Sequence, residues 1–129
     1  MPELPEVETV TNSIKNHLID SSFTDLQINW TKTLHNFSFY DFESRIKNIP
    51  IQNVFRRGKY IIIDFLECIL AVHLRMTGKL YVVNSIEPDK KHISLYMQFN
   101  DKYLIFEDTR KFGRFYLYNN LDYFLLHLI

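Results

Sequence analysis

Six short runs of β-branched and aromatic residues occupy most of the chain between residues 60 and 118. The runs are Tyr60–Leu66, Ile69–Leu74, Lys79–Val83, Ile93–Phe99, Tyr103–Glu107 and Arg114–Tyr118. Most neighbouring runs are separated by only a few residues, and Asn100-Asp101-Lys102 between two of them is a hairpin signal. Closely spaced strands with short turns predict antiparallel pairing, in either a sandwich or a barrel.

Helices are expected at two places before these runs. Apolar positions near the start of the chain recur at spacings of three and four, which puts them on one helix face: Leu4, Val7, Thr11, Ile14 and Leu18. Glu3, Glu6 and Glu8 fall in the first turns, where the helix dipole favours carboxylates. A second short helix is expected at Phe39–Ile46. The predicted fold class is therefore mainly β with α.

Length and composition limit the remaining choices. A chain of 129 residues is expected to form one domain, residues 1–129. Its 15 basic and 15 acidic residues give a formal net charge of zero, which by itself indicates no nucleic-acid partner. Cys68 is the only cysteine, so neither a disulfide nor a cysteine-based metal site is expected. Because no apolar run reaches about 18 residues, we expect no membrane span and a cytoplasmic protein.

The basic residues are distributed unevenly along the chain. Eight of the 15 fall in three clusters that each contain a glycine: Arg56-Arg57-Gly58-Lys59, Arg75-Met76-Thr77-Gly78-Lys79 and Arg110-Lys111-Phe112-Gly113-Arg114. Each cluster adjoins a predicted strand, so we expect turns at strand ends, where functional residues concentrate. One edge of the fold would then be basic, as a phosphate-backbone surface requires. The alternative is three ordinary solvated loops.

Two of these clusters place a large apolar residue beside a cation. Met76 follows Arg75, and Phe112 follows a pair of cations. An exposed apolar residue in a basic loop is suited to wedging between DNA bases. Spacing alone, however, favours the alternative that both side chains point into the core.

Four segments, taken in order, resemble one family, the bacterial formamidopyrimidine-DNA glycosylases. The segments are PELPEVE at the N-terminus, FRRGKY, HLRMTGKL and DTRKFG. The resemblance covers essentially the whole chain but only the N-terminal half of a family member. It implies a two-layer antiparallel β-sandwich with an N-terminal α-helix. It also implies base excision repair, in which a bifunctional DNA glycosylase and AP lyase excises 8-oxoguanine and formamidopyrimidines and then cleaves the strand by β,δ-elimination.

The resemblance assigns roles to the first residues. Pro2 looks like the family's nucleophile once Met1 is removed, because its nitrogen then becomes a secondary amine able to form a Schiff base with the sugar. Glu3 looks like the acid that protonates the sugar ring oxygen. Glu6 looks like a supporting carboxylate that holds the terminus in place.

Other matched positions would contact DNA. Lys59 resembles the family lysine on a hairpin turn that reaches the lesion nucleotide, and is expected to be catalytic. His73 and Arg110 resemble phosphate-contacting residues. Met76, Arg110 and Phe112 match the trio that fills the gap left when a damaged base is flipped out. For Met76 and Phe112 the resemblance therefore reverses the prediction from spacing.

Family members continue into a helical domain with a helix–two-turns–helix element and a four-cysteine zinc finger, and this chain contains neither. We therefore expect no metal or other cofactor in this chain, damaged double-stranded DNA as the partner, no membrane partner, and a monomer located at the nucleoid. The C-terminal half would be truncated or supplied in trans.

Three alternative functions stay open at this point. The first is a non-catalytic or vestigial DNA-binding domain, against which the intact Pro2, Glu3 and Lys59 argue. The second is an endonuclease VIII-like glycosylase of oxidised pyrimidines. Those enzymes usually carry glycine where Leu4 stands and lack the HLRM and RKFG patterns, so the oxidised-purine branch is favoured. The third is a β-sandwich without a role on DNA.

Overall fold

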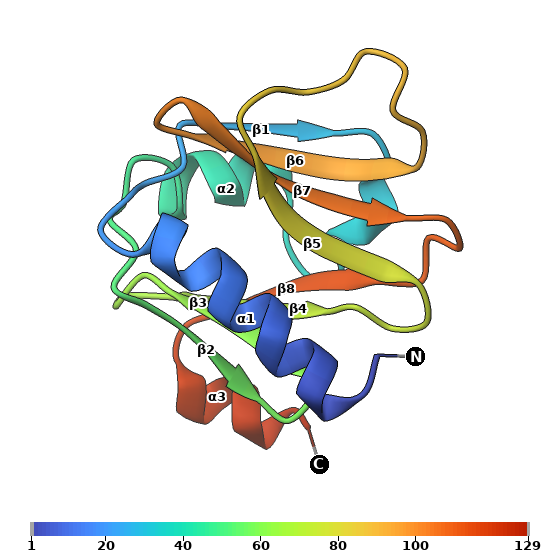
Figure 1. Ribbon diagram of the computed structural model, residues 1–129. Helices are drawn as coiled ribbons and strands as arrows, with labels where there is room; N and C mark the ends of the chain where they lie inside the picture. Colours follow the sequence, from blue (N-terminus) through green and yellow to red (C-terminus); the bar gives the residue numbers. More distant parts are fainter. Residues whose placement is uncertain (1, 129) are drawn as a thin grey trace.

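Two four-stranded antiparallel sheets face each other in the computed structural model, which describes residues 2–128 (Figure 1). The strand orders are β1-β6-β7-β5 and β2-β3-β4-β8. The strands are β1 Asp25–Ile28, β2 Asn53–Arg57, β3 Tyr60–Asp64, β4 Ile69–His73, β5 Gly78–Val83, β6 Ile93–Phe99, β7 Lys102–Asp108 and β8 Arg114–Tyr118. No strand ladder joins the two sheets within residues 2–128. The predicted sandwich is confirmed, and the barrel alternative is wrong.

The main core lies between the sheets and follows the alternation of the strands. Ile61 and Ile63 of β3 belong to this core, whereas Ile62 between them belongs to a second apolar cluster on the other face of its sheet. Phe124 covers that outer face, and its ring packs 5.1 Å from the ring of Tyr60. The central strands β3 and β4 are therefore buried on both faces, which explains their nearly continuous apolar sequences.

Helix α1, Leu4–Leu18, lies across the edge strands of both sheets and contacts β2 and β5 (Figure 1). Its buried side chains are Val7, Thr11, Ile14 and Leu18, as the spacing predicts. The expected burial of Leu4 is wrong, since its side chain is 43% exposed. Helical side chains point toward the helix N-terminus, so the first residue of α1 points past the helix instead of onto the sheets.

The other helices are short. A 3-10 helix, η1, spans Thr31–Thr33, and α2 spans Phe39–Arg45, within one residue of the predicted second helix. Helix α3, Leu121–Leu126, begins at Asn120, whose side chain accepts a hydrogen bond from the Tyr123 amide. No helix within residues 2–128 is long and apolar enough to cross a membrane.

Two strands were not predicted from the sequence, and one ends earlier than expected. β1 and β2 are short edge strands with one buried apolar residue each, Leu26 and Val54, so their sequences lack the long apolar runs of the central strands. β3 ends at Asp64 and not at Leu66, because the backbone of Leu66 has a φ of 76° and its amide donates to the Asp64 carboxylate. These differences do not change the fold class.

Candidate active site

The register of the second sheet brings two of the basic clusters to one end. Arg57 pairs with Tyr60, Tyr60 with His73, and His73 with Arg114, so these residues form one row across β2, β3, β4 and β8. The row is the last one before the Gly58-Lys59 turn that joins β2 to β3. The cluster at Arg56–Lys59 and the cluster at Arg110–Arg114 therefore lie at the same end of this sheet.

The remaining basic cluster, Arg75–Lys79, lies at the same end, because the β4–β5 turn contacts the β7–β8 turn. The β4–β5 turn contains Thr77, whose hydroxyl donates to the Asp108 carboxylate at the end of β7 and accepts from the Arg110 amide. Gly78, the first residue of β5, pairs with Asp108 across the sheet. All three basic clusters thus lie at the end of the sandwich where the N-terminus also lies (Figure 1).

Lys59 stands opposite the start of α1. Gly58, the first residue of the two-residue turn, has a φ of 60°, which favours glycine in a tight hairpin. The turn brings the Lys59 Nζ to 3.9 Å from Glu3 Oε2. The Glu3 side chain is 72% exposed, so this contact is a loose surface ion pair that contributes little to stability. Its importance lies in bringing two of the predicted catalytic residues together.

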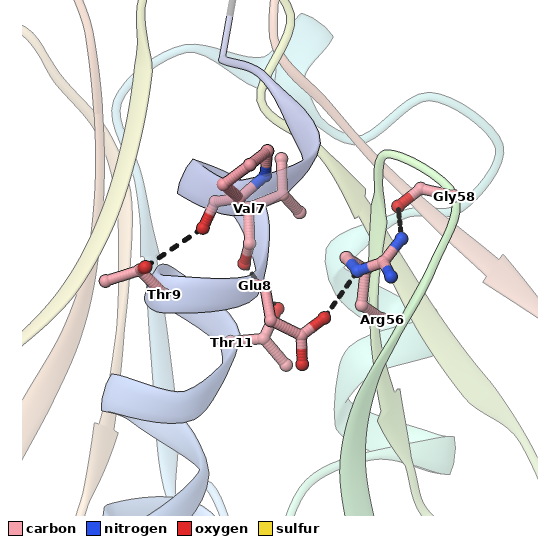
Figure 2. Close-up of polar contacts among 7 residues, drawn as sticks. Val7, Glu8, Thr9, Thr11, Arg56 and Gly58 are labelled. Atoms are coloured by element: carbon pink, nitrogen blue, oxygen red, sulfur yellow. Dashed lines mark hydrogen bonds and ion pairs between the residues drawn. The ribbon is translucent and has the colours of Figure 1, made fainter.

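A second contact ties the same turn to α1 (Figure 2). Arg56 Nε donates to Glu8 Oε2, and Arg56 Nη1 donates to the Gly58 carbonyl oxygen at 2.9 Å. The arginine therefore bridges the helix that follows Pro2 and Glu3 and the turn that carries Lys59. Neither Glu8 nor Arg56 was predicted from the sequence to have this role. No local pattern connects two residues so far apart in the chain.

The two remaining N-terminal candidates differ in their surroundings. Pro2 is half-buried beside the start of α1. Glu6 is exposed, and among residues 2–128 its carboxylate forms neither a hydrogen bond nor an ion pair. Glu8, two positions after Glu6, is the carboxylate of α1 that contacts the β2–β3 hairpin through Arg56. The supporting role expected for Glu6 stays a prediction.

His73 is held in a defined orientation at the end of β4. Its Nδ1 accepts a hydrogen bond from the Arg75 amide at 3.0 Å, and its ring packs edge-on against Tyr60 at 4.7 Å. Burial, followed by the charges of Arg75 and Lys59, lowers the pKa of His73 below its ordinary value. A neutral ring whose Nδ1 is an acceptor carries its proton on Nε2, which is then a hydrogen-bond donor suited to a phosphate oxygen.

The predicted gap-filling residues lie on the surface. Met76 is 46% exposed and Phe112 is 45% exposed, so the prediction from spacing that both belong to the core is wrong. The guanidinium of Arg110 lies 4.9 Å from the centre of the Phe112 ring. Lys111 and Arg75 adopt left-handed backbone conformations, each with a φ of 59°. Both turns therefore hold a non-glycine residue in an unfavourable conformation, as functional loops often do.

Sequence comparison identifies the family. The sequence model of the formamidopyrimidine-DNA glycosylase N-terminal domain matches residues 1–115. The chain belongs to this family. The formamidopyrimidine-DNA glycosylase of Protochlamydia amoebophila is 41% identical over 131 residues, which cover 99% of this chain and 48% of that protein. The formamidopyrimidine-DNA glycosylase of Streptococcus agalactiae is 39% identical over 118 residues, covering 91% of this chain and 43% of that protein.

Solved structures of the glycosylase family show the same fold. Lactococcus lactis Fpg in complex with DNA containing N7-benzyl-Fapy-dG superimposes with a TM-score of 0.90 at 33% identity, covering 98% of this chain and 47% of that chain. The same protein in complex with DNA containing an abasic site gives a TM-score of 0.90 at 32% identity. The chain thus spans about half the length of the relatives that it matches.

The zinc finger expected of full-length formamidopyrimidine-DNA glycosylases does not fit this chain's residues. The only cysteine, Cys68, is buried at the end of the sandwich opposite Lys59, and burial raises the pKa of its thiol. Within residues 2–128, no three histidine, cysteine or carboxylate side chains gather closely enough to hold a metal ion. A four-cysteine site cannot form from one cysteine.

Proposed function

We propose that this chain is the catalytic half of a glycosylase that excises oxidised purines in base excision repair. The observation that carries the proposal is the meeting of Glu3 and Lys59 beside Pro2, at the basic end of the sandwich. Membership of the formamidopyrimidine-DNA glycosylase family supports the same reaction. Damaged double-stranded DNA would be the substrate, and its phosphates would face the three basic turns.

The chemistry begins with the nitrogen of Pro2. While Met1 is attached, this nitrogen is a tertiary amide without a usable lone pair. After Met1 is removed it is a secondary amine, and a terminal amine titrates roughly two to three pKa units below a lysine. Its lone pair attacks C1′ of the damaged nucleotide, and the bond between C1′ and the base breaks with its electrons leaving on the base. The attacking nitrogen then gives up its proton, which neutralises the departing base and restores the lone pair that the nitrogen needs to form an iminium.

Glu3 would act in the next step. Protonation of the sugar ring oxygen accompanies cleavage of its bond to C1′, which leaves an iminium between C1′ and the Pro2 nitrogen. The iminium then accepts electrons as a proton leaves C2′ and the 3′ phosphate departs. Loss of a second proton from C4′ expels the 5′ phosphate. Lys59 would contact the lesion nucleotide and its phosphate during these steps, and His73 would donate from Nε2 to a phosphate.

The target base must leave the duplex before Pro2 can reach the sugar. We propose that Met76, Phe112 and Arg110 occupy the space that the flipped nucleotide vacates. Their support is exposure at the basic end, together with the contact between Arg110 and the Phe112 ring. An apolar wedge offsets part of the cost of unstacking, which amounts to a few kcal/mol per base step.

Borohydride trapping tests the catalytic proposal directly. Two forms of the chain, one with a free Pro2 and one retaining Met1, are incubated with an oligonucleotide that contains an abasic site. Borohydride delivers hydride to C1′ of the iminium and converts it into a stable amine link. We expect a covalent complex only with the free Pro2, and the Pro5→Ala variant with a free Pro2 should also be trapped.

One observation favours a second function. The residues of this chain cover about half of its relatives' length, so they account for only part of the phosphate contacts that a full-length relative can make, and DNA affinity depends steeply on the number of such contacts. A non-catalytic DNA-binding role is therefore the second candidate. The absence of a trapped complex at high protein excess, with removal of Met1 proven by mass spectrometry, would exclude catalysis by this chain. Salt-dependent binding to duplex DNA in the same preparation would then support the second candidate.

A further inference from the structure

Asp108 is the only fully buried carboxylate among residues 2–128, with an exposed fraction of 0%. It lies at the end of β7, and its two oxygens accept three hydrogen bonds. Oδ1 accepts from the Thr77 hydroxyl at 2.5 Å and from the Arg110 amide at 3.1 Å, and Oδ2 accepts from the Gly113 amide at 2.8 Å. Among the described residues no cation forms an ion pair with it. All three of its hydrogen-bond donors therefore belong to the β4–β5 turn or the β7–β8 turn.

These hydrogen bonds join two segments that are far apart in sequence. Arg110 and Gly113 flank Phe112 in the β7–β8 turn, whereas Thr77 directly follows Met76 in the β4–β5 turn. The Thr77 hydroxyl also accepts from the Arg110 amide at 3.3 Å. The carboxylate thus sets the separation between the turn that carries Met76 and the turn that carries Arg110 and Phe112.

The packing beneath the two turns leaves no space for a larger residue at Gly78 or Gly113. A Cβ added at Gly78 would collide with the Leu74 carbonyl oxygen and lie 3.0 Å from the Phe106 ring, and one added at Gly113 would collide with the same ring. Phe106 is fully buried, so its ring cannot move aside into solvent. Both turns therefore pack against the Phe106 ring, and the Thr77–Asp108 hydrogen bond connects them through polar groups.

We infer that Asp108 and Thr77 are positioning residues, which hold Met76 in register with Arg110 and Phe112 so that the three side chains fill one gap in the duplex. The inference rests on the proposed function, since it concerns the base-flipping step of that reaction. Neither residue touches the reacting atoms. Loss of their contact should impair substrates that require a base to be flipped and spare substrates that do not.

The experiment compares two substrates for each variant. One is a duplex carrying 8-oxoguanine opposite cytosine, in which a paired base must leave the stack. The other is a single-stranded oligonucleotide with an abasic site, in which no gap needs filling. Borohydride trapping rates are measured on both for the wild-type chain and for Thr77→Val, which removes only the hydroxyl. We expect Thr77→Val to lower the duplex rate about tenfold, the scale of one lost buried hydrogen bond, and the single-strand rate less than about twofold.

Two further variants separate positioning from folding. Thr77→Ser keeps the hydroxyl and should restore the duplex rate. Thr11→Val removes a more deeply buried hydroxyl, which bonds to the Val7 carbonyl oxygen at 2.7 Å in α1, and should leave the ratio of the two rates unchanged. Equal losses on both substrates for Thr77→Val, or an unchanged duplex rate, would overturn the inference while leaving the proposed function intact. A wild-type chain that is trapped on neither substrate would overturn both.

Discussion

The two ends of the sandwich are both built from tight turns, yet their surfaces differ in charge and shape. The end with Lys59 and Glu3 carries the three basic clusters and two exposed apolar side chains. The opposite end contains a cavity of about 560 Å³ beside the β3–β4 turn, lined in part by Ile49, Leu66 and Cys68. This cavity thus lies away from every predicted catalytic residue. In this chain the distribution of charge marks the candidate site better than concavity does, as expected for a surface that meets an extended polyanion.

Backbone strain does not distinguish the two ends. Arg75 at the basic end has a φ of 59°, and Leu66 at the opposite end has a φ of 76°. Leu66 is also 74% exposed, although it is a large apolar residue. Strain therefore accompanies tight turns in general, and only the chemistry of the strained side chain separates a functional turn from a structural one.

The largest expected effect is on the rate of borohydride trapping, and it compares Glu3 at the basic end with Glu67 at the opposite end. Glu3→Gln should lower the rate of borohydride trapping by about 10²–10⁴-fold, because it removes the proton donor to the sugar ring oxygen. The same variant should change the free energy of unfolding by less than about 1 kcal/mol, because the ion pair with Lys59 is exposed. Glu67→Gln, in the exposed turn at the opposite end, should change neither quantity. A trapping rate for Glu3→Gln within twofold of the wild-type rate would contradict the assigned role.

The next effect concerns pH and should be confined to the basic end. Burial lowers the pKa of His73 in the folded state, so the unfolded chain takes up the proton first as the pH falls below about 6.5. The stability contributed by neutral His73 is therefore complete above that pH and is lost as the pH falls through the folded-state pKa. Urea unfolding at pH 8 and pH 5 should show a larger loss of stability for the wild-type chain than for His73→Asn. Equal losses would show that His73 does not carry this dependence.

The smallest effect compares the two strained positions directly. Glycine at a left-handed position removes a conformational cost of about 1–2 kcal/mol but adds chain entropy to the unfolded state. Leu66→Gly should thus raise the melting temperature slightly and leave DNA binding unchanged. Arg75→Gly relieves the same strain but removes a cation and its hydrogen bond to the Tyr116 hydroxyl. Its binding to duplex DNA should show a salt dependence reduced by about one unit of slope if Arg75 contacts a phosphate. Identical DNA binding by the two variants would remove the distinction between the ends.

Much of the fold was predictable because local chemistry specifies it. The runs that became β6 and β8 have the bounds expected from their β-branched and aromatic residues. The apolar spacing of α1 predicted its buried face, except for Leu4. Edge strands β1 and β2 were missed because each is short and has only one buried side chain, so neither shows a long apolar run. Such strands are specified by the neighbours with which they pair.

The candidate site divides in the same way. The sequence by itself determined its residue types: a proline at position 2, a glutamate beside it, and three turns that combine cations with glycine. Only the tertiary structure decided that these segments share one end, because strand register and the packing of α1 set their separation. It also revealed the bridge between Glu8 and Arg56, which are 48 residues apart, and the contact of buried Asp108 with Thr77, which are 31 residues apart. Contacts between distant residues leave no local pattern, so neither of these two contacts could be predicted from the sequence alone.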